Sequence, residues 1–199
     1  MNRVASADTA NEHAMRPGFR TSLAYTRTAV VLHWIIGVAL LAEIGFGFYL
    51  RAIARGTPAR GPLTNLHKTV GIVLGVAILA RLAWRLAHRP PPFPATVPVW
   101  QASAARFNHA AMYVCMVVIP VAGYIASNFS KFGLKWFGTM ILPPWGPDRP
   151  DVYAFFNGLH DLAAYVLVAL VVVHVVATLK HALVDGDRPF SRLSLRHSR

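Results

Sequence analysis

The stretch FFNGLHDLAAYVLVALVVVHVVATLKHAL, residues 155–183, decides the fold, because it is long and apolar enough to cross a membrane as one helix. His160 and His174 lie fourteen residues apart in it, close to four helical turns, so both rings leave the same face of the helix. Their separation along the axis is roughly 21 Å, most of the thickness of a hydrocarbon core of about 30 Å. Because an unpartnered imidazole is unfavourable in hydrocarbon, the two histidines predict two metal or cofactor levels, one near each membrane surface.

The composition of the 199-residue chain is that of a membrane protein. Hydrophobic residues make up 55% and charged residues 14%, with a mean hydropathy of +0.43, whereas a soluble domain carries about 25% charged residues. The single Cys115 excludes an internal disulfide, and the lack of a C-x-x-C-H motif excludes covalent attachment of a c-type haem. The chain opens on polar sequence, so we expect no signal peptide.

Four apolar runs, each near the length that a spanning helix needs, predict an all-α, integral-membrane four-helix bundle. The intervals between them carry Gly and Pro, including Gly61 and Pro62 in the first. We expect these residues to lie outside the spanning helices, because Pro lacks a backbone donor. The third interval, residues 128–155, is rich in Trp and Phe and suggests a cap at the membrane interface. The predicted spans are Thr28–Leu50, Leu66–Leu86, Phe107–Ser127 and Phe156–Leu183.

The distribution of Lys and Arg predicts the orientation of the bundle. Thirteen of these residues fall on the side of the two termini and the second interval, and seven fall on the other side. The positive-inside rule therefore places both termini in the cytoplasm. The expected parts are a cytoplasmic N-terminal tail (1–23), a four-helix membrane domain (24–187) and a basic cytoplasmic C-terminal tail (188–199).

In this topology the histidines of the spans sort into two depths. His67 and His160 begin the second and fourth predicted helices near the outer surface, whereas His33 and His174 lie at a similar depth near the inner surface. A pair of imidazoles on facing helices is a standard means of holding a haem iron, and helix bundles build cofactor sites from such inward-facing side chains. His109, which begins the third predicted helix, is an alternative for one inner ligand.

Four stretches carry a resemblance to a known family: YTRTAVVLHW, NLHKTVGIVLGVAILARLAWRL, FNHAAMYVCMVVIPVAGY and GLHDLAAYVLVALVVVHVVATLKHALVDGD, one in each predicted helix. Over residues 24–195 the chain resembles the bacterial cytochrome b561 family of four-helix, di-haem, quinone-reactive proteins. The resemblance implies two haem b groups, ubiquinone as a substrate and a multi-pass place in the bacterial inner membrane. It pairs His33 with His174 at the inner haem and His67 with His160 at the outer haem. Some members resemble the superoxide oxidase, which passes an electron from superoxide to ubiquinone.

Three further polar residues in or beside the spans need a role. Arg81 follows His67 by fourteen residues, so it reaches the inner level, where a haem propionate would suit its planar fork; a place at the lipid headgroups is the other reading. His181 resembles a family position near the quinone headgroup, and snorkelling to the interface is the other reading. Glu43 lies inside the first span, and the sequence does not decide its role.

These features predict a membrane electron carrier between the quinone pool and a donor at the outer face. Basic residues there, including Lys68, Lys131 and Lys135, would draw in an anionic donor such as superoxide or an acidic electron-transfer protein. Two other classes stay open: a membrane-anchor or relay subunit of a multi-subunit dehydrogenase, and a haem-free membrane protein that binds lipid or a partner. Nothing in the sequence points to nucleic acid.

Overall fold

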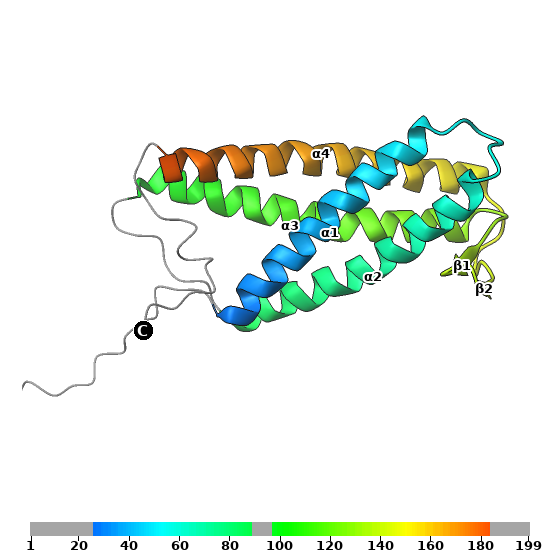
Figure 1. Cartoon of the computed structure of the whole chain (residues 1–199), viewed down its shortest axis with the longest axis horizontal. Helices are drawn as coiled ribbons and strands as arrows, with labels where there is room; N and C mark the ends of the chain where they lie inside the picture. Colours follow the sequence, from blue (N-terminus) through cyan, green and yellow to red (C-terminus); the bar gives the residue numbers. More distant parts are fainter. Residues whose placement is uncertain (1–25, 89–96, 184–199) are drawn as a thin grey trace, which may run out of the picture.

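The computed structural model describes residues 26–88 and 97–183, which form four long helices and one small β-hairpin (Figure 1). The predicted tails, 1–23 and 188–199, lie outside the described residues. The helices run antiparallel to their neighbours in the chain, and the hairpin lies at one end of the bundle (Figure 1). The elements are α1 (Arg27–Ala52), α2 (Arg60–Ala87), α3 (Val99–Asn128), β1 (Leu134–Trp136), β2 (Met140–Leu142) and α4 (Pro150–Leu183).

Each of the four helices is long and apolar enough to cross a membrane, with a mean hydropathy between 1.8 and 2.6 over its most apolar window. Large apolar side chains point outward along all four, among them Val38 on α1, Val76 on α2, Val114 on α3 and Val176 on α4. Such a surface is unfavourable in water and suits lipid. The predicted all-α, four-helix membrane bundle is confirmed.

α1 begins within one residue of its predicted start, whereas the other three helices begin six to eight residues earlier than the hydropathy pattern predicts. The expectation that Gly61 and Pro62 lie outside the helices was wrong, because α2 begins at Arg60. The first turn of a helix has no intrahelical partner for its N–H groups, so a proline there costs no hydrogen bond. Pro150 likewise begins α4. His67 and His109 therefore lie well inside their helices rather than at the first residue.

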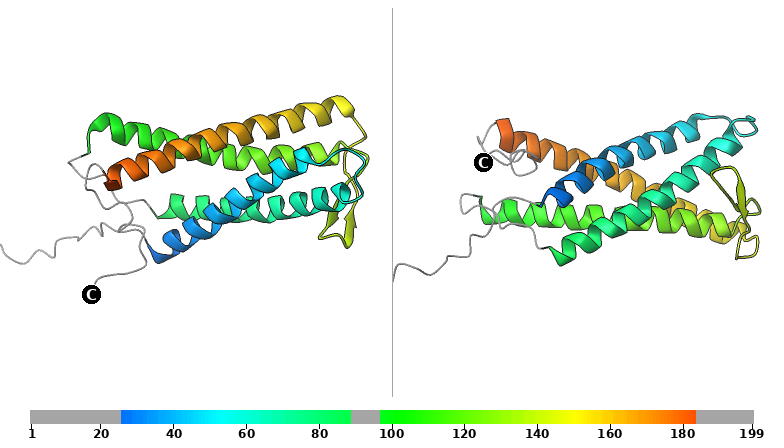
Figure 2. Two further views of the ribbon diagram at one scale, coloured as in Figure 1. Left: turned by 45° about the horizontal axis from the view of Figure 1, so that its top comes forward. Right: turned by 60° about the horizontal axis from the view of Figure 1, so that its bottom comes forward.

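The bundle is assembled from two helix pairs. α1 packs on α2 and α3 packs along α4, while α2 and α3 join the pairs (Figure 2). An apolar layer fills the middle of the bundle, between the predicted outer and inner histidine levels. It holds the inner and outer ends apart as two separate sites. Its buried members are Ile36, Leu40, Leu74, Ile78, Cys115, Met116 and Leu167.

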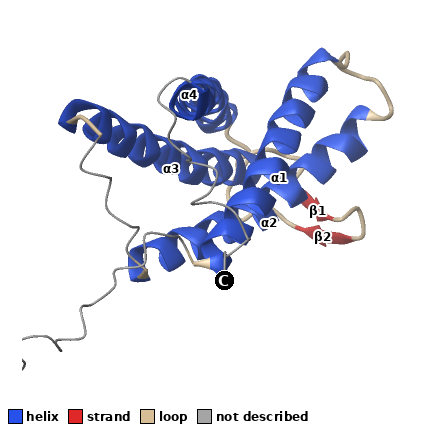
Figure 3. Cartoon of the chain, turned by 60° about the vertical axis from the view of Figure 1, so that its left-hand side comes forward, coloured by secondary structure: helices blue, strands red, loops and turns tan. Residues whose placement is uncertain are grey.

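The interval after α3 forms the cap that its aromatic content suggested. β1 and β2 pair antiparallel, and both Phe137 and Gly138 in the turn between them have positive φ. The hairpin lies beside α2 (Figure 3). It is fastened there because Lys68 donates to the Gly133 carbonyl and Asn65 accepts from the backbone N–H of Lys135. The cap therefore lies beside the helical turns that carry His67.

Candidate metal-binding histidine levels

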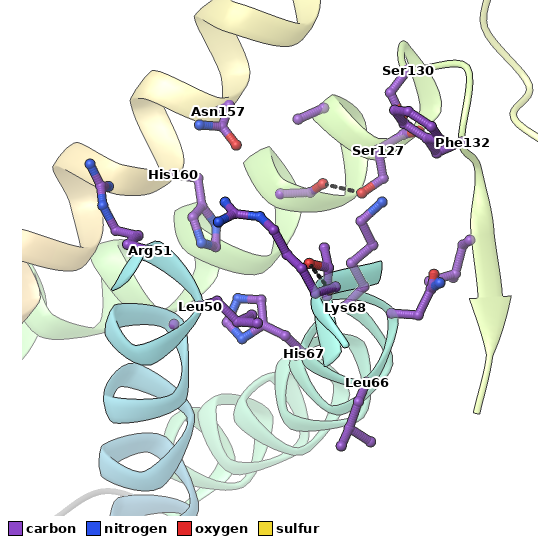
Figure 4. A pocket seen from close by; sticks show the side chains of 18 of the residues that line it. Leu50, Arg51, Leu66, His67, Lys68, Ser127, Ser130, Phe132, Asn157 and His160 are labelled. Carbon is purple, nitrogen blue, oxygen red and sulfur yellow. Dashed lines mark hydrogen bonds between the residues drawn. The ribbon is translucent and has the colours of Figure 1, made fainter. Parts of the chain in front are cut away.

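The outer level joins α2 and α4 through His67 and His160 (Figure 4). Their ring centroids lie 6.1 Å apart and their planes are nearly perpendicular, at 87°. Two imidazoles on opposite sides of one metal ion, each with its nitrogen about 2 Å from the ion, have centroids roughly 6 Å apart. The pair therefore has the separation that two ligands of one iron require.

Nδ1 of each of these two histidines lies next to an oxygen atom. His160 donates from Nδ1 to the Ile119 carbonyl at 2.8 Å, beside Pro120 in α3. Nδ1 of His67 lies 2.7 Å from Oε1 of Glu43 on α1. Metal-ligating histidines commonly direct their second nitrogen to a carbonyl or a carboxylate in this way. His160 is thus left with Nε2 for a metal, and the carboxylate beside Nδ1 of His67 favours Nε2 as the metal-binding nitrogen of that ring as well.

Two glycines make room for the outer histidines. A Cβ atom at Gly123 on α3 would lie 2.9 Å from Nδ1 of His160, closer than real side chains pack. A Cβ atom at Gly47 on α1 would lie 3.3 Å from Cε1 of His67. The two helices can approach the rings this closely only because these positions lack side chains.

A cavity of about 1830 Å³ surrounds the outer pair (Figure 4). It exceeds the roughly 300–1,000 Å³ of most small-molecule pockets, so it has space for a large cofactor. Its inner part is apolar and includes Leu40, Leu74 and Ile78, and its outer rim is basic. An apolar floor with charged groups at the mouth suits a flat macrocycle whose acidic substituents face the rim.

The inner level brings together three histidines rather than two. His33 on α1 and His174 on α4 have ring centroids 6.5 Å apart, again close to the ligand spacing of one iron. His109 on α3 lies nearer to His174, at 5.2 Å, and donates from Nδ1 to the Ala105 carbonyl of its own helix. The early start of α3 explains this, because it places His109 ten residues into the helix. The choice of inner ligands stays a prediction.

Arg81 lies at the inner level, in contact with one of these histidines. Its Nη2 atom is 3.2 Å from Nδ1 of His33, and its Nε donates to the Tyr113 hydroxyl at 3.1 Å. Nη1 is 3.4 Å from the Ala29 carbonyl. A guanidinium has donors only, so Nδ1 of His33 is the acceptor in this contact. The pairing of Arg81 with a propionate stays a prediction.

The other predicted site residues lie at the two ends of the bundle. His181 is half-buried in the last turn of α4, seven residues beyond His174. Lys68, Lys131 and Lys135 all line the outer cavity. Lys131 and Lys135 are exposed, whereas Lys68 is half-buried and hydrogen-bonded to the cap.

The histidine pairs suit a metal that brings ligands of its own. Among the described residues no group of three or more His, Cys, Asp and Glu side chains is arranged to hold a bare ion. A haem supplies four ring nitrogens to its iron, so two histidines complete the coordination. Haem therefore fits the donor set, the ring spacing and the cavity at the outer level.

Sequence reasoning missed the supports of the outer pair. A carboxylate inside an apolar helix was the signal for Glu43, but its partner on α2 could not be read from the sequence. The hydrogen bond of His160 to the Ile119 carbonyl and the space that Gly123 leaves for the His160 ring could not be read from the sequence, since neither involves an unusual residue type. Arg51 at the end of α1 binds Asp161, the residue after His160, at 2.8 Å, and this contact also emerged only from the structure.

Comparisons with known proteins identify the family of the chain. A family model described as prokaryotic cytochrome b561 matches residues 24–193. Cytochrome b561 homolog 2 from Escherichia coli (strain K12) is 27% identical over 170 residues, covering 85% of this chain and 90% of the relative. Cytochrome b562 from Cereibacter sphaeroides is 27% identical over 173 residues, covering 85% of this chain and 94% of the relative.

Proposed function

The chain belongs to the prokaryotic cytochrome b561 family of haem b membrane cytochromes, which transfer electrons, and we propose that this member is a superoxide:ubiquinone oxidoreductase with two haems. The observation that carries the proposal is the pair of histidine levels, each with two rings 6.1–6.5 Å apart, on either side of an apolar layer. Two such levels give a route for electrons from one membrane surface to the other.

His67 and His160 would hold the outer haem, and His33 and His174 the inner haem. When bound, each haem supplies a carrier that takes up and releases one electron. The protein's own part is to fix the rings. The Ile119 carbonyl accepts from Nδ1 of His160, Glu43 faces Nδ1 of His67, and the helices exclude water from the apolar layer between the levels.

The outer face supports an anionic donor. Exposed Arg55, Lys131 and Lys135 line the cavity mouth near the outer pair, and clustered positive charge accelerates the encounter with anions. Two superoxide ions give up one electron each and become two molecules of O₂. The two electrons and two protons convert one ubiquinone to ubiquinol.

The inner end would serve the quinone. His181 lies one to two turns beyond His174 on α4, toward the membrane surface where water supplies protons. An imidazole at that position can pass protons to the reduced quinone, because its two ring nitrogens can take up a proton and give one up. The proposal also keeps the predicted orientation, with the His181 end and both tails at the cytoplasmic side of the bacterial inner membrane.

One observation favours a second candidate, a relay subunit of a larger dehydrogenase. The cap carries exposed apolar side chains, including Phe132, Phe137, Ile141 and Trp145. An exposed apolar group beside an electron-entry site suits a partner subunit as well as it suits lipid. Co-purification of a stoichiometric soluble subunit, together with a slow reaction with superoxide, would favour this candidate.

The decisive experiment is stopped-flow reduction of the purified protein by superoxide, followed at the haem α-band with and without ubiquinone. We expect fast reduction that slows with salt, because the screening length falls from about 30 Å at 0.01 M to about 8 Å at 0.15 M ionic strength. The double variant Lys131→Gln/Lys135→Gln should lower both the rate and its salt dependence. Arg27→Gln, which removes an exposed charge at the other end of α1, is the control. A slow rate that ignores salt and both variants would refute the proposal.

A further inference from the structure

Glu43 is a buried acid whose only close polar partner among the described residues is a candidate haem ligand. Its side chain is 11% exposed, and that of His67 is 21% exposed. Oε1 of Glu43 and Nδ1 of His67 are 2.7 Å apart and both atoms are buried, but the pair lacks the alignment of a hydrogen bond, and neither atom has a hydrogen-bond partner among the described residues. A carboxylate buried within a membrane span is unfavourable unless something compensates for it. The His67 ring is the polar group that faces the carboxylate here.

The surroundings of this pair confine both side chains. Glu43 and Gly47 are four residues apart on α1, so they share the face that meets α2. The glycine leaves space for the His67 ring, and Phe46 packs edge-on against that ring with centroids 5.9 Å apart. On α2, Gly71 lies opposite the carboxylate, where an added Cβ would be in ordinary contact with Oε1 at 3.7 Å. The helices therefore hold carboxylate and ring together at one place.

The inner level has the opposite charge beside its histidines. Arg81 places a guanidinium 3.2 Å from Nδ1 of His33, in the position that Glu43 takes toward His67. The described residues contain only three other acids, Asp148, Asp151 and Asp161, of which the last two pair with arginines at the outer end. The two sites therefore differ in charge: a carboxylate lies beside His67 at the outer level, and a guanidinium lies beside His33 at the inner level.

We propose that Glu43 is a positioning residue that faces Nδ1 of His67 at 2.7 Å and lowers the reduction potential of the outer haem. A carboxylate beside Nδ1 favours the tautomer that keeps its proton on Nδ1 and leaves Nε2 free, and it makes the ring a stronger electron donor, as carboxylates do behind metal-bound histidines. A negative charge near a haem also disfavours the reduced form, which carries one more electron.

The consequence is a direction for electron flow, and this step rests on the proposed function. The outer site, with its carboxylate, releases an electron more readily than the inner site, with its guanidinium. Electrons that enter at the outer face therefore move toward the inner level and the quinone. An inward potential step of this kind also limits return of electrons to oxygen at the outer face.

The test is a spectroelectrochemical titration of the purified holoprotein and of Glu43→Gln. The glutamine keeps an oxygen that can accept from His67 but removes the charge, so both haems should stay bound. We expect the reduction potential of one of the two haems to rise by at least about 59 mV, which is a tenfold change in its one-electron equilibrium constant. The potential of the other haem should stay in place. Asp161→Asn is the matched control, since it removes a carboxylate beside His160 that is one-third exposed and bound to Arg51; it should shift the potential much less.

A second variant separates positioning from charge. Glu43→Ala should raise the same potential and also change the electron paramagnetic resonance spectrum of that haem, because the ring of His67 loses its fixed orientation. Two bound haems with neither potential moved in Glu43→Gln would overturn the inference and leave the proposed function intact. Fewer than two haems in the unaltered protein would instead refute the proposed function.

Discussion

Gly123→Ala should release the outer haem selectively, because the missing side chain at this position is what lets α3 approach His160. The added Cβ would lie 2.9 Å from Nδ1 and 3.3 Å from Cε1 of the ring, where ordinary contacts begin near 3.4 Å. The ring must therefore retreat by about half an ångström, which is the tolerance within which a ligand constellation has to be held.

This movement of the His160 ring is unfavourable, because its Nδ1 atom donates to the Ile119 carbonyl on α3 at 2.8 Å. Moving the ring away from Gly123 stretches this hydrogen bond and turns Nε2 from its present direction. Loss of such a support behind a metal-bound histidine typically lowers metal affinity 10- to 100-fold, or about 1.4 to 2.7 kcal/mol. We expect a weakening of this size for the outer haem and none for the inner haem, which lies beyond the apolar layer.

The measurement is a haem titration of the variant, with a pyridine haemochrome assay for haem per chain after gel filtration. Gly45→Ala and Gly158→Ala are the controls, since a Cβ at either position meets nothing within 4 Å. Gly158 is two residues from His160 on the same helix, so it tests for a general effect of altering α4. Two tightly held haems in Gly123→Ala, or equal losses in the controls, would refute the assignment of His160 as an outer ligand.

Three further predictions concern the inner level and the quinone. His174→Ala should leave one haem per chain in the haemochrome assay, because the outer pair does not depend on it; retention of both would show that another group replaces it. Arg81→Ala should lower the potential of the inner haem, since a nearby positive charge favours the reduced form, and an unchanged or higher value in a redox titration contradicts this. His181→Ala should slow quinone-dependent haem oxidation in stopped flow with both haems in place, and unaltered kinetics would place the quinone elsewhere.

Hydropathy and histidine spacing were sufficient to predict features that depend only on the position of a residue along its helix axis. The four spans, and the depths of His67 with His160 and of His33 with His174, follow from counting residues at 1.5 Å each. The starts of the helices did not follow, because Gly61 and Pro62 are breakers inside a helix but are tolerated in its first turn.

The rotation of each helix about its own axis was the harder part. A helix that is apolar on all sides gives no sequence signal for the face that turns inward, and α1 and α4 are of this kind. Which side chains meet across the bundle is therefore decided by packing between helices. The contacts of Glu43 with His67 and of His109 with His174 could not be read from the chain for this reason.

The choice of ligands for the inner haem and the partner of Arg81 depend on each other. In the present arrangement Arg81 donates toward Nδ1 of His33, which leaves the ring proton on Nε2, the nitrogen that a metal would need. For His33 to bind iron through Nε2, the guanidinium must release Nδ1, and a haem propionate is an acceptor that binds Arg more strongly than a neutral imidazole does. His109 needs no such exchange, because its Nδ1 already donates to Ala105. The predicted propionate contact of Arg81 and ligation by His33 therefore require each other, and if Arg81 keeps its present partner, the inner ligand opposite His174 is His109.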